Sequence, residues 1–227
     1  MPVTLSIAEK EFRLGELPVP LKLTEVLPAR GPWEVEIGFG KGRYLLKRAF
    51  ESPEIRFLGV EMANAYYRLA RKRARHRHIA NLILVRGEAL FVLSSVLPAE
   101  FAAAVHVYFP DPWPKARHQK RRLFDPETVD LVLRLLRPGG TLYFATDHLD
   151  YGDAVRELLM TYPAVAVAER RRMWDDGART NYEAKYITEG RPILRLEITR
   201  IAPETGSLLH PLGEPGVVAA TSHRAGT

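Results

Sequence analysis

The chain has 227 residues, of which 46% are hydrophobic and 26% charged, and its formal net charge is +6. This length and composition predict one globular domain with a full core. The longest apolar runs have only strand length and residues 1–10 lack a secretory signal pattern, so we expect a cytoplasmic protein without a membrane span. The absence of cysteine excludes disulfides, thiolate metal sites and cysteine nucleophiles, and we expect no metal.

Strand-like and helix-like segments alternate along most of the chain. Residues 1–30 are mixed and contain prolines, and we interpret them as an N-terminal arm. Strands are then predicted over residues 33–37, 56–60, 82–85, 102–108 and 141–145, and helices over 42–50, 63–78, 89–96, 126–136 and 150–162. This alternation predicts an α/β fold, in which helices cover both faces of a mostly parallel sheet.

The alternation ends near the C-terminus. Two more strand-like segments, residues 164–169 and 193–201, are predicted to pair like a hairpin at the sheet edge, and a long polar connection separates them. The tail, residues 203–227, is rich in small residues and proline, and we expect it to be mobile. The predicted domain therefore spans residues 31–202.

A glycine-rich turn joins the first predicted strand to the first helix, with the sequence Glu36-Ile37-Gly38-Phe39-Gly40-Lys41-Gly42. Gly38 and Gly40 permit a tight turn and a close approach of the backbone to a ligand. The spacing differs from that of dinucleotide-binding motifs, and the acid before the glycines disfavours a pyrophosphate. An acid at this place suits the cationic amino-acid end of a ligand.

Two further acids follow the next two predicted strands. Glu61 ends the second strand, where a carboxylate can accept both hydroxyls of a ribose, and Glu88 follows the third, where it can meet an adenine amino group. Three acids at three successive strand ends, together with a glycine-rich turn, predict a binding site for S-adenosylmethionine.

The segment after the fourth predicted strand combines prolines, an acid, an aromatic residue and cations. Alternate prolines hold Asp111 and Trp113 on a stiff, extended loop at the carboxyl end of the strand. Five Lys or Arg residues lie within 115–122, and six lie within 68–77. This combination predicts chemistry on a polyanion.

These segments resemble the tRNA (guanine-N7)-methyltransferase family of the bacterial single-chain type. The resemblance spans about residues 33–199. It rests on the glycine-rich turn, Gly59-Val60-Glu61, residues 109–123, Pro138-Gly139-Gly140, Thr146-Asp147 and residues 180–185. It implies a class I (Rossmann-like) S-adenosylmethionine-dependent methyltransferase fold, whose seven-stranded, mostly parallel sheet ends in an antiparallel pair. It also implies methyl transfer to N7 of a guanosine in tRNA; monomer and homodimer both stay open.

The resemblance implies a role for each matching residue. The residues expected to bind the cofactor are Glu36, Gly38, Gly40, Glu61, Glu88 and Asp111, and Asp111 is also the expected active-site acid. Those expected to contact the guanosine are Lys115, Asp147, Thr180, Asn181, Tyr182 and Glu183. Those expected to hold RNA are Arg117, His118, Gln119, Lys120, Arg121 and Arg122. The chain departs from the family pattern at Glu88, where an aspartate is expected, and at Ala116 and Gln119, where the family often has Lys and His.

The expected chemistry leaves the role of the active-site acid open. Guanine N7 carries no proton, so catalysis needs positioning and electrostatics rather than a base. Asp111 either stabilises the purine ring as it becomes cationic or grips guanine N1–H and the N2 amino group. Asp147 and Glu183 are the alternative carboxylates that would accept hydrogen bonds from these two guanine groups.

Two competing interpretations remain at the level of the sequence. Asp111-Pro112-Trp113 is similar to the loop of methyltransferases that act on the exocyclic amines of adenine or cytosine, although the basic run is foreign to them. A non-catalytic RNA-binding module with a Rossmann-like core is the other interpretation, but such a module would not need three cofactor acids.

Overall fold

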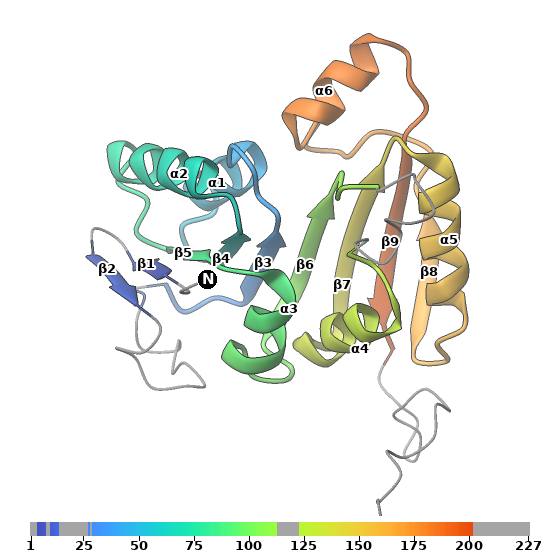
Figure 1. Ribbon diagram of the computed structural model, residues 1–227, viewed down its shortest axis with the longest axis horizontal. Helices are drawn as coiled ribbons and strands as arrows, with labels where there is room; N and C mark the ends of the chain where they lie inside the picture. The colour runs from blue at the N-terminus through green and yellow to red at the C-terminus, as the bar shows by residue number, and fades with distance from the viewer. Residues whose placement is uncertain (1–3, 8–9, 14–26, 28, 113–122, 202–227) are drawn as a thin grey trace, which may run out of the picture.

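A single nine-stranded sheet organises the part of the chain that the computed structural model describes, which is residues 4–7, 10–13, 27, 29–112 and 123–201 (Figure 1). The strand order is β2-β1-β5-β4-β3-β6-β7-β9-β8. The strands are β1 (Thr4–Ile7), β2 (Lys10–Arg13), β3 (Trp33–Ile37), β4 (Arg56–Glu61), β5 (Leu82–Arg86), β6 (Ala102–Tyr108), β7 (Leu136–Thr146), β8 (Val165–Glu169) and β9 (Leu194–Arg200). The helices are α1 (Arg43–Glu51), α2 (Asn64–His76), α3 (Ala89–Phe91) with a π-helical continuation (Val92–Val96), α4 (Pro126–Leu135), α5 (Leu149–Met160) and α6 (Asn181–Thr188).

The five central strands, β5, β4, β3, β6 and β7, run parallel to one another. On one side β9 pairs antiparallel with β7, and β8 pairs antiparallel with β9. The predicted seven-stranded, mostly parallel sheet is confirmed in the strands β3 to β9. Because the central strands are parallel and adjacent, their carboxyl ends meet at one edge, where ligands bind in sheets of this kind.

The predicted arm contains a hairpin that the sequence analysis did not expect. Strand β1 pairs antiparallel with β5, from Thr4 opposite Arg86 to Ile7 opposite Ile83, and β2 pairs with β1. Both strands have only four residues, too few for a clear alternating pattern. The hairpin extends the sheet and covers the edge of β5.

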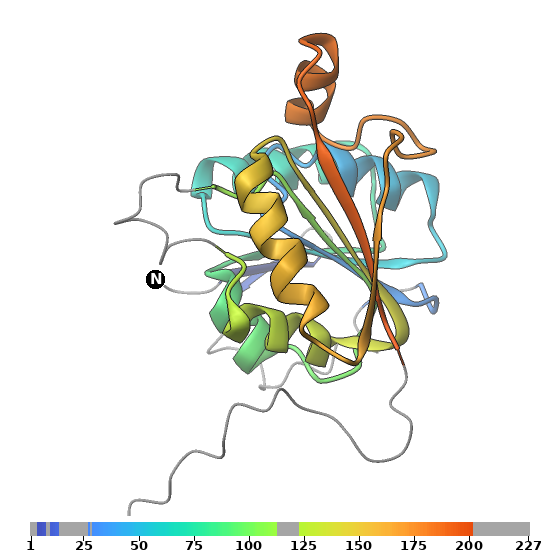
Figure 2. The same ribbon diagram turned by 90° about the vertical axis from the view of Figure 1, so that its right-hand side faces the viewer.

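Helices cover both faces of the sheet, and this explains the apolar runs of the central strands. In β4, Leu58 and Val60 belong to the core cluster that also holds side chains of α4 and α5, whereas Phe57 belongs to the cluster with α1 and α2. Figure 2 shows α5 lying across the strands. No described helix is long and apolar enough to cross a membrane.

A third, aromatic cluster lies at the carboxyl edge of the sheet. Its buried members are Tyr44, Tyr108, Ala145 and Trp174. Trp174 comes from the connection between β8 and α6, so a loop covers this part of the sheet. The cluster forms the base of the site described below.

The polar connection between the last two strands contains α6, which was not predicted. Its eight residues lack a strong apolar stripe, although Thr180 and Glu183 have the spacing of a helix-capping motif. Thr180 is the N-cap, and its hydroxyl accepts the N–H of Glu183 at 2.9 Å. In both views α6 projects beyond the edge at which β6 and β7 end (Figures 1 and 2).

Candidate functional site

The glycine-rich turn between β3 and α1 has a backbone that favours glycine. Gly38 has a φ of 72° and Gly40 a φ of 53°, in the left-handed region that other residues rarely adopt. The N–H of Gly38 donates to the carbonyl of Val60 at 2.8 Å, which joins the turn to the end of β4. The chain therefore turns sharply at the centre of the carboxyl edge.

Glu61, the last residue of β4, holds this turn in place. One carboxylate oxygen accepts the N–H of Gly40 at 2.8 Å, and the other accepts the N–H of Ala63 at 2.8 Å. Each carboxylate oxygen has a second lone pair, so both can still accept a hydrogen bond from a ligand hydroxyl. Glu61 thus positions the turn, and its carboxylate can still accept the two ribose hydroxyls that the sequence predicts as its partners.

Glu36 is a buried acid with an unpartnered oxygen. Its side chain is 3% exposed, and burial raises its pKa to about 8, despite a hydrogen bond from the backbone of Leu45. The neighbouring charge of Glu61 raises this pKa further, whereas that of Arg179 lowers it. Within the described residues Oε2 has no hydrogen-bond partner, which is uncommon for a buried oxygen. The oxygen therefore fits a donor supplied by a ligand.

The remaining predicted acids complete a row along the same edge. Glu88 is exposed at the N-cap position of α3, but its side chain caps nothing. Asp111 is exposed in the loop after β6, and Asp147 follows β7 with 26% of its side chain exposed. Together with Glu61 and Glu36, these acids lie at or just beyond the ends of β5, β4, β3, β6 and β7, which are neighbours in that order.

Phe109, which begins the proline-rich loop, has an unusual backbone. Its φ is 52°, although the residue before a proline is expected to be extended, so this part of the predicted extended loop is wrong. A left-handed conformation is strained for a bulky residue. The N–H of Phe109 donates to the carbonyl of Ala145 at 2.7 Å, and its ring packs on Tyr182 and Tyr186 of α6. These contacts hold the turn that leads to Asp111.

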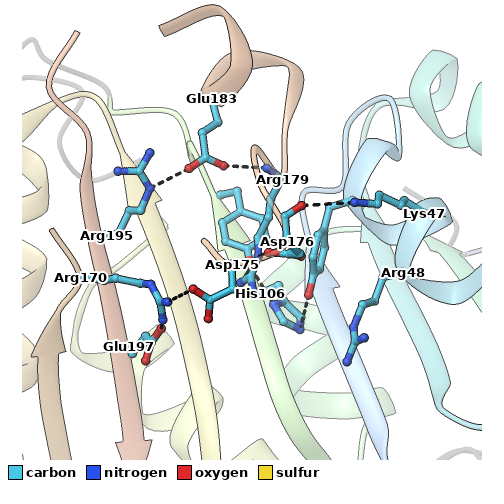
Figure 3. A network of polar contacts seen from close by, with 12 residues as sticks. Lys47, Arg48, His106, Arg170, Asp175, Asp176, Arg179, Glu183, Arg195 and Glu197 are labelled. Carbon is cyan, nitrogen blue, oxygen red and sulfur yellow. Dashed lines mark hydrogen bonds and ion pairs between the residues drawn. The ribbon is translucent and has the colours of Figure 1, made fainter. Parts of the chain in front are cut away.

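Arg179, a residue that the sequence analysis missed, lies in the aromatic cluster (Figure 3). Its guanidinium carbon is 4.2 Å from the centre of the Trp174 ring and 5.0 Å from that of Tyr44. It also donates to the hydroxyl of Tyr108 at 2.5 Å and to Asp176 at 3.0 Å. A single arginine in a polar connection gives no pattern in the sequence, because the rings around it come from distant elements.

A buried histidine connects this cluster to the sheet beneath it. Nδ1 of His106 on β6 lies 2.9 Å from the Tyr108 hydroxyl, and Nε2 of the same ring lies 3.3 Å from the carboxylate of Glu34 on β3. Burial lowers the pKa of His106 despite the carboxylate, so its ring is neutral at pH 7. Its ring stacks on that of Tyr143 with centroids 5.1 Å apart. Tyr108 is therefore held by hydrogen bonds with both His106 and Arg179.

The predicted guanosine-contacting residues 180–183 have two different environments. Glu183 is fully buried, and its oxygens accept the Nε–H of Arg195 at 2.7 Å and the backbone N–H of Arg179 at 2.8 Å. Thr180 caps α6. Both side chains therefore hold the connection before α6, and the guanosine contacts expected of them stay predictions. Asn181 and Tyr182 are exposed.

The predicted basic segment follows the loop that carries Asp111. Lys115 and Trp113, and the predicted RNA-holding residues Arg117, His118, Gln119, Lys120, Arg121 and Arg122, lie outside the described residues, as does the tail 203–227. Within the described part of the chain there is no group of three or more His, Cys, Asp or Glu that could hold a metal ion.

The fold has counterparts among solved methyltransferases. A 16S rRNA methyltransferase, KamB, superposes with a TM-score of 0.63 at 15% identity, covering 88% of this chain and all of that one. The 16S rRNA adenine-N(1) methyltransferase of Catenulisporales acidiphilia, solved with the cosubstrate SAM, has a TM-score of 0.57 at 18% identity. This match covers 90% of the present chain and 100% of that one. These similarities confirm the predicted class I methyltransferase fold.

The sequence has curated relatives over most of its length. Residues 30–196 match the family Methyltransf_4, described as "Putative methyltransferase". A tRNA (guanine-N(7)-)-methyltransferase of Treponema pallidum is 38% identical over 187 residues, which cover 80% of this chain and 74% of the relative. The enzyme of that name from Nitrosococcus oceani is 34% identical over 181 residues, which cover 80% of this chain and 77% of the relative. The chain belongs to the tRNA (guanine-N(7)-)-methyltransferase family, as the resemblance in its motifs predicted.

Proposed function

We propose that this protein transfers a methyl group from S-adenosylmethionine to N7 of a guanosine in tRNA. The observation that carries the proposal is the row of five acids along one sheet edge, around a glycine-rich turn and with an unpartnered oxygen on buried Glu36. Membership of the family and the names of its curated relatives support the same reaction. The cytoplasmic location and the choice between monomer and homodimer stay predictions.

Three of the acids suit the three parts of the cofactor. Glu36 would accept a hydrogen bond from the cationic amino group, Glu61 would accept the ribose hydroxyls, and Glu88 would accept the adenine amino group. Gly38 and Gly40 have no side chains, so the cofactor could approach the backbone of the turn beside these acids. When bound, S-adenosylmethionine supplies an electrophilic methyl group on a sulfonium.

The other two acids suit the guanine. The lone pair of N7 forms the new bond to carbon while the sulfur–carbon bond breaks, and the positive charge passes from sulfur to the purine. Asp111, exposed at the end of β6, would stabilise that charge or grip the N1–H and N2 amino groups. Asp147, which follows β7 with 26% of its side chain exposed, and buried Glu183 are the alternatives for accepting these hydrogen bonds. The other candidate guanosine contacts are Lys115, Thr180, Asn181 and Tyr182, and residues 117–122 remain candidate RNA contacts.

The test is incubation with labelled S-adenosylmethionine and an unmodified tRNA transcript, followed by nucleoside analysis. The expected product is 7-methylguanosine, with no label transferred when the tRNA is omitted. Label on an exocyclic amine of adenine or cytosine would support the competing methyltransferase interpretation. Tight RNA binding without cofactor binding would support a non-catalytic module.

Replacement of Asp111 tests its part in the mechanism. Asp111→Asn keeps the size of the side chain and removes the charge, so the single-turnover rate at saturating substrates should fall by roughly 100-fold or more. Binding of cofactor and tRNA should change much less, because the charge acts mainly in the transition state. Asp153→Asn on the surface of α5 is the matched control. A near-parental rate with poor tRNA affinity would make Asp111 a binding residue.

A further inference from the structure

Helix α2 carries an unusual concentration of positive charge. Its sequence, NAYYRLARKRARH, contains five Lys or Arg residues and no acid. Arg68, Lys72 and Arg75 are spaced four and three residues apart, so they form one stripe along the helix. All three are exposed, whereas Tyr67 and Ala70 of the same helix are buried against α1 and the sheet. We call these three residues the α2 stripe.

In the part of the chain that the structure describes, the α2 stripe has no neighbouring carboxylate that neutralises it. No carboxylate in the described residues pairs with any of the three, whereas lysines on α1 and α6 each have an acid four residues further along. Like charges three and four residues apart oppose helix formation. The helix dipole favours cations in the last turn, which accounts for Arg75 but not for Arg68 or Lys72. A helix face that served only solubility would mix both signs.

The position of α2 places the stripe beside the candidate active site. The helix begins three residues after Glu61, and Arg73 donates to the carbonyl of Lys41 in the glycine-rich turn at 2.9 Å. Figure 1 shows α2 to one side of the edge at which β6 and β7 end, and α6 beyond that edge. A large polyanion whose reacting base lies at that edge can therefore extend over α2.

We propose that the α2 stripe binds the phosphate backbone of the tRNA substrate. From Arg68 to Arg75 the stripe is about 10 Å long, at the usual rise of a helix, which corresponds to about three phosphates of one strand. The proposal rests on the proposed function, because that function makes tRNA the polyanion that reaches this edge. It adds a second cationic surface to the predicted RNA-binding residues 117–122, beside which Ala116 lacks the charge that the family often has.

The test compares three variants of the full chain with the parent in tRNA binding at several salt concentrations. Arg68→Gln with Arg75→Gln removes two charges from the stripe, and Arg68→Lys with Arg75→Lys retains them. Arg137→Gln with Arg156→Gln is the control, because it removes the same charge from the start of β7 and from α5. The stripe neutralisation should weaken binding about tenfold at 0.1 M salt and flatten the log–log salt slope by close to 2 units. The lysine variant and the control should stay near the parent.

Two readouts separate this proposal from the proposed function. Cofactor affinity should be equal in all four proteins, which shows that each is folded. A parental salt slope in the neutralised variant, or the same change in the control, would overturn the α2 proposal even if the parent forms 7-methylguanosine. A flattened slope confined to the stripe variant supports it, even if nucleoside analysis of the parent finds a different methylated base.

Discussion

The buried carboxyl of Glu36 should make cofactor affinity depend on pH. Burial raises its pKa to about 8, so at pH 7 the free protein mostly holds this group protonated. A cationic amino group is bound best by the carboxylate. The dissociation constant for S-adenosylmethionine should therefore fall about tenfold between pH 6.5 and pH 8, and calorimetry should detect proton release on binding.

The control for this prediction is Glu36→Gln, whose affinity should be weaker and independent of pH in this range. The effect of this group on protein stability has the opposite dependence on pH to its effect on cofactor affinity. Because the folded state holds its proton up to about pH 8 and the unfolded state only to about 4.5, this group's contribution to stability falls as the pH rises through that window. A pH-independent affinity in the parent would contradict the assigned contact.

Arg179 should act on both stability and the titration of Glu36. Arg179→Gln removes a cation that lies beside four aromatic rings and donates a hydrogen bond to the Tyr108 hydroxyl. The free energy of unfolding should therefore fall by about 2–4 kcal/mol. The same change removes a charge that lowers the pKa of Glu36, so the pH midpoint of cofactor binding should move upward. Calorimetric titrations at several pH values measure this. Arg170→Gln is the control: its guanidinium carbon lies 5.9 Å from the centre of the Trp174 ring, but its charge is not among those that shift the pKa of Glu36, so the midpoint should stay in place. An unmoved midpoint in Arg179→Gln would limit Arg179 to a structural role.

The element α6 should depend on a buried ion pair. Glu183 is fully buried and Arg195 nearly so, and breaking such a pair costs about 3–5 kcal/mol because the remaining charge is left unpaired. Glu183→Ala should therefore lower the unfolding temperature strongly. Asp147→Ala, at the neighbouring strand end, should lower methyl transfer with little change in that temperature. Loss of activity in Glu183→Ala at an unchanged unfolding temperature would contradict this structural role and support the direct substrate contact predicted from the sequence.

The elements differ in how far the sequence predicts them, for a physical reason. Strand β6 is largely buried, so its apolar run predicts its bounds to the residue. Strand β3 alternates apolar and acidic residues, and this pattern also predicts its bounds to the residue. The hairpin β1–β2 and α6 are short and weakly patterned, and pairing or packing with the rest of the chain forms them. The acids of the site were predictable because parallel strands bring their ends together. Arg179 and the left-handed Phe109 depend on contacts between distant elements, which no local pattern contains.

At the scale of the whole molecule, the N-terminal hairpin should limit self-association. Deletion of residues 1–13 would leave β5 with an unpaired edge from Ile83 to Arg86. The truncated chain should be less stable and should associate in light-scattering measurements, while cofactor binding persists because Glu36 and Glu61 lie on inner strands. A truncated chain as monodisperse as the parent would show that the hairpin does not protect this edge.

The strained backbone of Phe109 has a consequence for the entropy of the reaction. Its N–H is held by β7 and its ring by α6, so the chain just before Asp111 is already ordered in the folded protein. Ordering a catalytic group when substrate arrives would subtract from binding affinity. Here the loss of conformational freedom next to Asp111 is incurred during folding, before any tRNA is present. In the proposed reaction, the tRNA would therefore meet an acid that is already positioned beside the end of β6.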